Sequence, residues 1–212
     1  RIMGGAAGHM SHPFDLGWVN SGSDLLDFFD KAKTFVEKEG AGAVKIDGVN
    51  VSFKLVGDDE NKQFAVDRGS LKPIDIEGIT MDRVDDRFPE GHGMRPAIRT
   101  LLTILNQALP QIKPELEDLG MWDDPSRFLN TEYVAGTTNV TKYEENFLAI
   151  HGLSQFYHKI HTRTGSERPG MERPEGVKAP SVEISYNPTT MENLVKKLNS
   201  VAEEYGFRVY GS

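Results

Sequence analysis

One stretch carries most of the information in this chain, and it reads Ala43-Val44-Lys45-Ile46-Asp47-Gly48-Val49-Asn50-Val51-Ser52-Phe53. Before Gly48 the apolar residues occupy even positions, so Lys45 and Asp47 share the opposite face of an extended segment. After Gly48 the apolar residues occupy odd positions. A strand changes face only through a bulge or a turn, and glycine permits one. The sequence therefore predicts a lysine and a carboxylate that project the same way, beside a backbone break that a ligand can approach closely.

The same alternation predicts the neighbouring strands. It continues from residue 49 to residue 55 and, after a polar turn at residues 57–61, over residues 62–67, which indicates a β-hairpin. Further strands are predicted at residues 128–134, 147–153 and 182–186. Residues 161–180 hold several prolines and glycines, and we expect a surface loop there with no fixed structure of its own.

Three helices are predicted. The first covers residues 23–39, with Ser23 as its cap, and the second begins near residue 95. We expect Pro110 and Pro114 to interrupt the second helix. The third begins at the capping box Thr189-Thr190-Met191-Glu192 and ends at Gly206. Together these elements predict an α+β fold with an antiparallel sheet core and helices packed outside, as an N-terminal arm (1–22) and one domain (23–212).

A lysine beside a carboxylate suits covalent chemistry on a phosphate. An amine is a nucleophile only when deprotonated, and partial burial lowers a lysine pKa. The nearby carboxylate opposes that effect, and Mg²⁺ on the substrate phosphates could offset it. The alternative interpretation is a surface ion pair between Lys45 and Asp47 near a turn, since motifs this short also occur by chance.

The segment Lys45-Ile46-Asp47-Gly48-Val49-Asn50 resembles the nucleophile motif of the covalent nucleotidyltransferases, namely DNA ligases, RNA ligases and mRNA-capping enzymes. The asparagine at the sixth position is most similar to the RNA ligases that seal nicks in duplex RNA. The resemblance implies an antiparallel-sheet adenylation domain in which Lys45 attacks the α-phosphate of ATP, or less favourably GTP, and carries AMP. It also implies Mg²⁺ and a polynucleotide 5′-phosphate as the acceptor. Nucleotide contacts are implied for Val44, Ile46, Asp47, Gly48 and Asn50.

Two further family motifs are matched in part. Asp67-Arg68-Gly69-Ser70 follows the hairpin, where the family has an arginine that contacts ribose or phosphate, although the spacing to glycine differs. Arg68 either takes that role or is an exposed turn residue. Phe128-Leu129-Asn130-Thr131-Glu132-Tyr133 resembles the acidic strand of the family, which implies that Glu132 contacts the ribose or a magnesium-bound water. A carboxylate in such a strand needs a partner, because burying it unpaired is costly. The alternative interpretation is that Glu132 forms a structural salt bridge.

The later family motifs are weak. Phe147-Leu148-Ala149-Ile150-His151-Gly152 resembles the strand that stacks on the base, with Ile150 and His151 in place of the usual Phe–Asp pair. Ile150 could still cover a base. The fourth motif has only Glu175-Gly176-Val177-Lys178, inside the proline-rich segment, and the fifth has no counterpart. We expect either that this chain is part of a larger polypeptide whose last strands lie beyond Ser212, or that it is a degenerate member.

Composition limits the remaining classes. The 212 residues have a net charge of −8, so nucleic-acid binding would need a local patch. No cysteine occurs, which excludes disulfide scaffolds and thiol nucleophiles, and no P-loop motif is present. No run approaches the roughly 18 apolar residues of a membrane span, so we expect no membrane partner and a cytoplasmic protein.

Two other functions remain open. Gly8-His9-Met10-Ser11-His12-Pro13-Phe14 resembles the start of large proteins of tailed phages, which favours a viral origin and the host cytoplasm. The chain could then be a nucleotide- or RNA-binding module of a larger phage protein that has lost turnover, or a purely structural phage protein.

Overall fold

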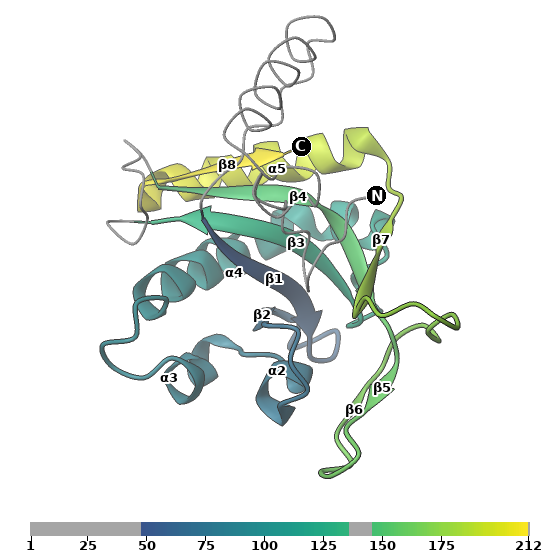
Figure 1. Ribbon diagram of the computed structural model, residues 1–212. Coiled ribbons are helices and arrows are strands. Elements are labelled where there is room, and N and C mark those ends of the chain that lie inside the picture. The colour runs from purple at the N-terminus through teal and green to yellow at the C-terminus, as the bar shows by residue number, and fades with distance from the viewer. Residues whose placement is uncertain (1–47, 136–145, 212) are drawn as a thin grey trace, which may run out of the picture. The chain divides into compact units, whose positions relative to one another are not determined.

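A six-stranded sheet organises the part of the chain that the structure, a computed structural model, describes: residues 48–135 and 146–211 (Figure 1). The order of five strands is β2-β1-β3-β4-β7. The sixth strand, β8, pairs with the first residues of β4, and β7 pairs with its last residues. All of these pairs are antiparallel except β4 with β8. The strands are β1 (Val49–Val56), β2 (Gln63–Asp67), β3 (Arg127–Val134), β4 (Asn146–Phe156), β7 (Ser181–Ile184) and β8 (Phe207–Gly211). A separate hairpin consists of β5 (Lys159–Ile160) and β6 (Glu167–Arg168).

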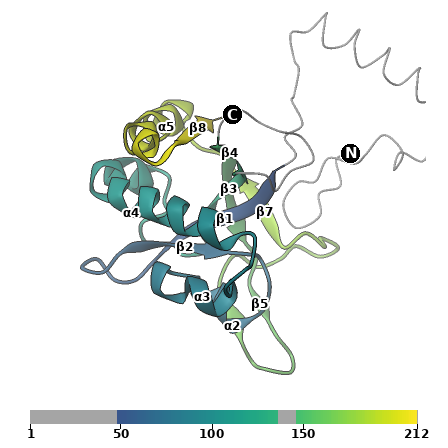
Figure 2. The same ribbon diagram turned by 90° about the vertical axis from the view of Figure 1, so that its left-hand side faces the viewer.

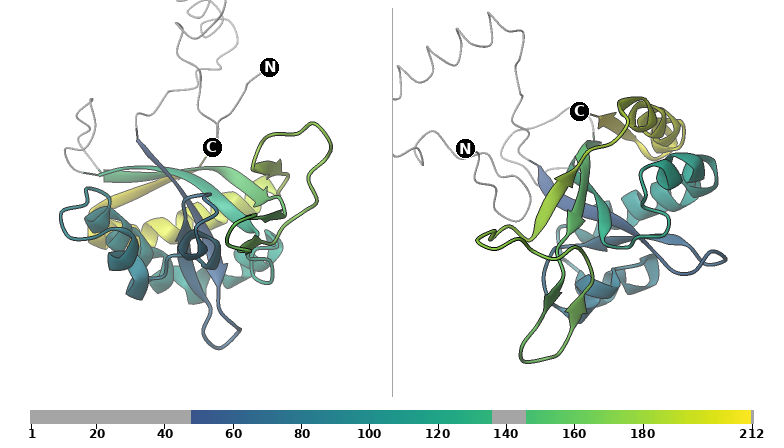
Figure 3. Two further views of the ribbon diagram at one scale, coloured as in Figure 1. Left: turned by 60° about the horizontal axis from the view of Figure 1, so that its bottom comes forward. Right: turned by 90° about the vertical axis from the view of Figure 1, so that its right-hand side faces the viewer.

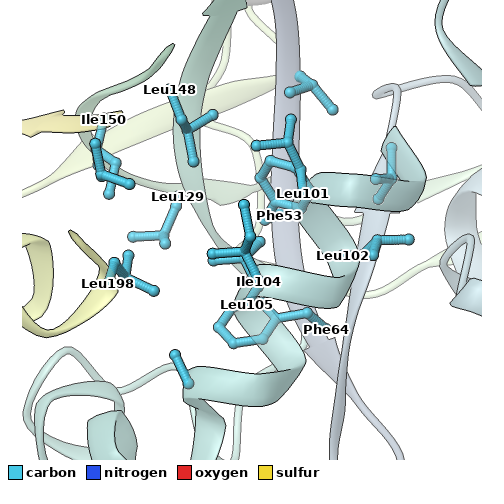
Figure 4. Packing of buried hydrophobic residues seen from close by; sticks show 14 of the residues in the cluster. Phe53, Phe64, Leu101, Leu102, Ile104, Leu105, Leu129, Leu148, Ile150 and Leu198 are labelled. Atoms are coloured by element: carbon cyan, nitrogen blue, oxygen red, sulfur yellow. The ribbon is translucent and has the colours of Figure 1, made fainter. Parts of the chain in front are cut away.

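Two long helices cover one face of the sheet, which we call the helix side (Figure 2). Alternate residues of the strands, such as Phe53, Leu129 and Leu148, meet apolar residues of these helices there (Figure 4). The described helices are α2 (Pro73–Glu77), η2 (Met81–Arg83), α3 (Val84–Arg87), α4 (Arg95–Asp118), α5 (Pro188–Ala202) and η3 (Glu203–Tyr205). The two long ones are α4 and α5, and their amphipathic stripes close the apolar core.

The opposite face of the sheet, which we call the far side, contains a buried ion cluster. Lys54 of β1 donates from Nζ to Asp67 of β2 at 2.7 Å and to a main-chain oxygen of α2, that of Ile76, at 2.6 Å. Arg168 of β6 donates to both carboxylate oxygens of Asp67, at 2.6 and 3.0 Å. Burial lowers the pKa of Lys54 from its ordinary value, while the Asp67 carboxylate opposes that shift. The cluster therefore joins β1, β2, α2 and β6.

This cluster corrects the expectation that residues 161–180 form a loop without fixed structure. Within that segment β6 pairs with β5, and Arg168 is buried against Asp67, 101 residues earlier in the sequence. Figure 3 (right) shows the hairpin on the side of the sheet away from α4 and α5. The reason for the correction is long-range: the buried Asp67 carboxylate pairs with Arg168 of the hairpin as well as with Lys54, and this buried contact holds β6 in place.

The strand expectations are confirmed. β1 and β2 form the predicted hairpin, and β3, β4 and β7 lie within a few residues of the predicted bounds. The fold is mixed α+β with a mainly antiparallel sheet. The expected helix at residues 23–39 and the arm at residues 1–22 lie outside the described residues.

Two helix expectations are wrong. α4 continues through Pro110 and Pro114 for 24 residues, because Ala108, Ile112 and Leu116 lie fully buried on either side of these prolines. Tertiary packing thus outweighs the cost of a proline inside a helix, about 3 kcal/mol each. α5 begins before the expected capping box, because the side chain of Asn187 accepts the N–H of Thr189 at 3.0 Å.

A β-bulge interrupts the pairing of β3 with β4. Asn130 lies opposite Gly152, but Thr131 lies opposite Ile150, so His151 has no partner residue on β3. Leu148 and Ile150 before the bulge and Leu153 after it all face the core on the helix side. The extra residue therefore projects to the far side, as bulges commonly re-aim a side chain.

The outer edge of β8 is bonded by a side chain. Asn199 of α5 accepts the N–H of Val209 at 2.7 Å and donates to its carbonyl oxygen at 2.8 Å. Among the described strands β8 pairs only with β4. The Asn199 amide thus occupies the position that another strand's backbone would take at Val209.

Candidate functional site

The candidate site lies at the beginning of β1, where Gly48 contacts Glu132 of β3. The Gly48 N–H donates to Oε1 of Glu132 at 2.8 Å. A Cβ atom at position 48 would lie 2.7 Å from both Cγ of Glu132 and the carbonyl oxygen of Tyr133. Only glycine fits so close to a neighbouring backbone. The glycine at position 48 is thus required by the close approach of Glu132 and Tyr133, and the predicted approach of a ligand stays a prediction.

Glu132 has the partners that the sequence analysis required. Its carboxylate is 19% exposed, and Oε2 lies 3.2 Å from Nε2 of His151. An ionised carboxylate accepts hydrogen bonds and has no hydrogen to donate. Nε2 of His151 is therefore the donor to an ionised Glu132. The two oxygens of Glu132 thus bind two different strands, the start of β1 through Oε1 and the bulge of β4 through Oε2.

Asn50 lies next to Glu132 on the far side. The two residues are directly opposite in the β1–β3 register, where side chains on one face are neighbours. Nδ2 of Asn50 also lies 3.4 Å from Oδ1 of Asn130. Together these polar residues form what we call the Glu132 site: Gly48, Asn50, Asn130, Glu132 and His151.

Arg68 follows β2 directly and reaches the start of β1. Its Nη1 donates to the main-chain oxygen of Asn50. Its positive charge also acts on the phenol of Tyr133. Burial raises the pKa of Tyr133 to about 12, and the positive charge of Arg68 opposes that shift. Arg68 is thus exposed and lies near the start of β1, bonded to the backbone of Asn50, a residue of the Glu132 site.

Ile150 lies away from the site, which corrects its expected role against a base. It is 1% exposed and belongs to the core on the helix side (Figure 4). The residues of β4 on Glu132's side are Phe147, Ala149 and His151, with Ala149 directly opposite Glu132. The physical reason is the two-residue period of the strand: Leu148 and Ile150 share one face, and that face is the core.

The remaining expected residues lie outside the description. Lys45, together with Val44, Ile46 and Asp47, precedes Gly48 directly in the sequence but falls outside the described residues. Of the expected nucleotide contacts, the structure brings together Gly48, Asn50 and Glu132. Sequence reasoning missed His151 as a partner of Glu132, although its replacement of a family aspartate was a signal.

The described residues contain no group of three or more histidine or acidic side chains that could hold a metal ion. Glu132 is therefore the only expected magnesium contact within them. Magnesium bound through substrate phosphates needs only one or two protein carboxylates, so Glu132 alone fits that mode of binding.

Two hollows in the described part of the chain lie elsewhere. A groove of about 1120 Å³ runs along α5 and β7, past Tyr186, Met191 and Val195. A smaller hollow of about 370 Å³ lies near Lys54 and Trp122. Neither hollow is lined by residues of the Glu132 site. The site is therefore identified by its hydrogen bonds and not by a cavity.

Comparisons with known proteins give no assignment. The chain matches no family model, and neither the curated proteins nor the solved structures compared with it gave a match. Among the described residues, every helix is too short or too polar to cross a membrane.

Proposed function

We propose that this chain contains the nucleotide-binding part of an ATP-dependent RNA ligase-like nucleotidyltransferase that carries AMP on Lys45. One observation carries the proposal: Gly48, the last residue of the Lys45-Ile46-Asp47-Gly48 motif, is hydrogen-bonded to Glu132, 84 residues later. The pairing of β1 with β3 thus brings the segment that resembles the nucleophile motif beside the segment that resembles the acidic strand of the family.

The proposed reaction is nucleotidyl transfer to an amine. Nζ of Lys45, once deprotonated, attacks the α-phosphorus of ATP. A P–N bond forms, the bond from the α-phosphorus to the bridging oxygen breaks, and pyrophosphate leaves with the bonding electrons. The AMP group would then pass to a polynucleotide 5′-phosphate. Such reactions depend chiefly on positioning and on stabilising negative charge.

The described side chains suit the ribose end of a nucleotide. A carboxylate accepts from hydroxyl groups, and an amide both accepts and donates, so Glu132 and Asn50 together match a ribose diol. Magnesium, when bound to the phosphates, would supply positive charge against the triphosphate. Asp47, on the predicted face of Lys45, would contact the ribose or an adjoining group.

A second candidate is a nucleotide- or RNA-binding module without turnover. The sequence favours it: the fourth family motif has only a weak match, the fifth has no counterpart, and the net charge is −8.

Labelling separates the two candidates. The protein is incubated with α-³²P-labelled ATP and magnesium and then analysed by denaturing electrophoresis. The nucleotidyltransferase predicts an acid-labile label that Lys45→Ala abolishes and that Lys72→Ala, at an exposed lysine, leaves intact. Label that survives Lys45→Ala would contradict the nucleophile assignment. ATP binding by calorimetry without label would favour the binding module, and the absence of both would contradict both candidates.

A further inference from the structure

The bulge in β4 gives His151 a specific neighbour. Alternation up to the bulge places Phe147, Ala149 and His151 on Glu132's side, and the register places Ala149 directly opposite Glu132. His151 is thus the diagonal neighbour of Glu132, a separation that long side chains span across a sheet. Gly152, which follows, lies opposite Asn130 and adds no side chain beside it.

The contact fixes the orientation of the carboxylate. Nε2 of His151 lies 3.2 Å from Oε2, while the Gly48 N–H holds Oε1 at 2.8 Å. Each carboxylate oxygen has more than one acceptor direction, so these two bonds leave capacity for a hydroxyl donor. With only the Gly48 bond, the side chain of Glu132 could rotate about that contact and lose part of its order.

We propose that His151 is a positioning residue, which holds Glu132 so that its carboxylate accepts hydrogen bonds from the ribose hydroxyls of a bound nucleotide. The proposal rests on the proposed function for the presence of a nucleotide, but not on turnover. In this proposal His151 acts on the nucleotide through Glu132. The chemical class that the pair would recognise is a ribonucleotide with free 2′ and 3′ hydroxyls.

The test compares two nucleotides by calorimetry. ATP has both ribose hydroxyls, and 2′,3′-dideoxyATP has neither. We expect His151→Ala to weaken ATP binding about tenfold, since bonds to a charged group are commonly worth that much. Binding of 2′,3′-dideoxyATP should change less than about twofold, because Glu132 then has no hydroxyl to accept from. His151→Gln, which keeps an N–H donor, should restore part of the affinity for ATP.

A matched control is available in the β5–β6 hairpin. His158 also contacts a glutamate, with Nε2 2.6 Å from Oε1 of Glu167, and the two histidines are about equally exposed, at 38% and 39%. His158→Ala should change neither affinity.

The outcomes are distinguishable. Equal losses for the two nucleotides in His151→Ala would mean that His151 only supports the fold, and an unchanged ATP affinity would mean that it does not position Glu132. Wild-type protein that binds both nucleotides equally would overturn the ribose contact. ATP binding without covalent label would contradict the nucleotidyltransferase while this comparison still decides the role of His151. The absence of all ATP binding would overturn both proposals.

Discussion

Replacing Asp67 by asparagine should be among the most damaging single substitutions in the described fold. Asp67 is fully buried and accepts from Lys54 at 2.7 Å, from Arg168 at 2.6 and 3.0 Å, and from the N–H of Gly69 at 2.7 Å. Asp67→Asn keeps the size of the side chain but removes its charge, so Lys54 and Arg168 would remain buried without a balancing carboxylate at this position. Removing one partner of a buried ion pair costs about 3–5 kcal/mol. For a chain of this size that corresponds to a fall of roughly 6–20 °C in Tm.

Urea unfolding at pH 7, followed by circular dichroism, measures this cost as the change in the free energy of unfolding. Asp85→Asn is the matched control, because Asp85 also has two cationic partners, Arg95 and Arg99, but lies exposed. Its unfolding midpoint should stay at the wild-type value. A loss below about 1 kcal/mol for Asp67→Asn, the range of a surface ion pair, would refute the account of the buried cluster.

Three further perturbations test other parts of the fold. Burial raises the pKa of Tyr133 from 10.0 to about 12, so the unfolded chain ionises first and stability should fall between these pH values. Between pH 10 and pH 12 the wild-type protein should lose up to about 2 kcal/mol of unfolding free energy in urea that Tyr133→Phe does not lose, and an equal loss in both proteins would count against the buried phenol. Pro110→Ala, at an exposed position inside α4, should raise the free energy of unfolding by about 1–3 kcal/mol; Gln111→Ala should have little effect, and a destabilised Pro110→Ala protein would contradict the helix geometry. Asn187→Ala should lower the free energy of unfolding, measured in urea, by about 1 kcal/mol, and Thr189→Ala should lower it by less. A larger loss for Thr189→Ala would support Thr189 as the cap, as predicted from the sequence.

Local pattern predicted five of the six strands of the sheet, but it predicted neither β8 nor the contacts of the segments that cover the sheet. The alternation of Val49, Val51, Phe53 and Leu55 predicted β1 because successive side chains of a strand point to opposite faces, although Ser52 and Lys54 on the other face are buried as well. No local pattern could show that Arg168 belongs to Asp67, because the pair is 101 residues apart and the surrounding prolines favour a loop. The path of α4 through its prolines likewise depended on the core that surrounds it.

The candidate site was predictable where chemistry demanded a partner. A glutamate within an otherwise apolar and neutral strand needs one, and Gly48 and His151 both supply hydrogen bonds to Glu132. The burial of Ile150 was predictable from the alternation of the strand. Ile150 is two residues from Leu148, a core residue, and the two side chains therefore face the same side of the sheet. The bulge at His151 was not predictable, because it appears only in the register of two strands distant in sequence.

The bond between Asn199 and Val209 has a consequence for self-association. An unpaired strand edge is a template onto which another molecule can add its own strand, and repeated addition leads to aggregates. At Val209 that template is already filled by an amide that mimics a backbone. Any incoming strand would have to expel Asn199 before it could pair at this point. At Val209 a single side chain thereby opposes edge-to-edge stacking, without a proline or a lysine at that position.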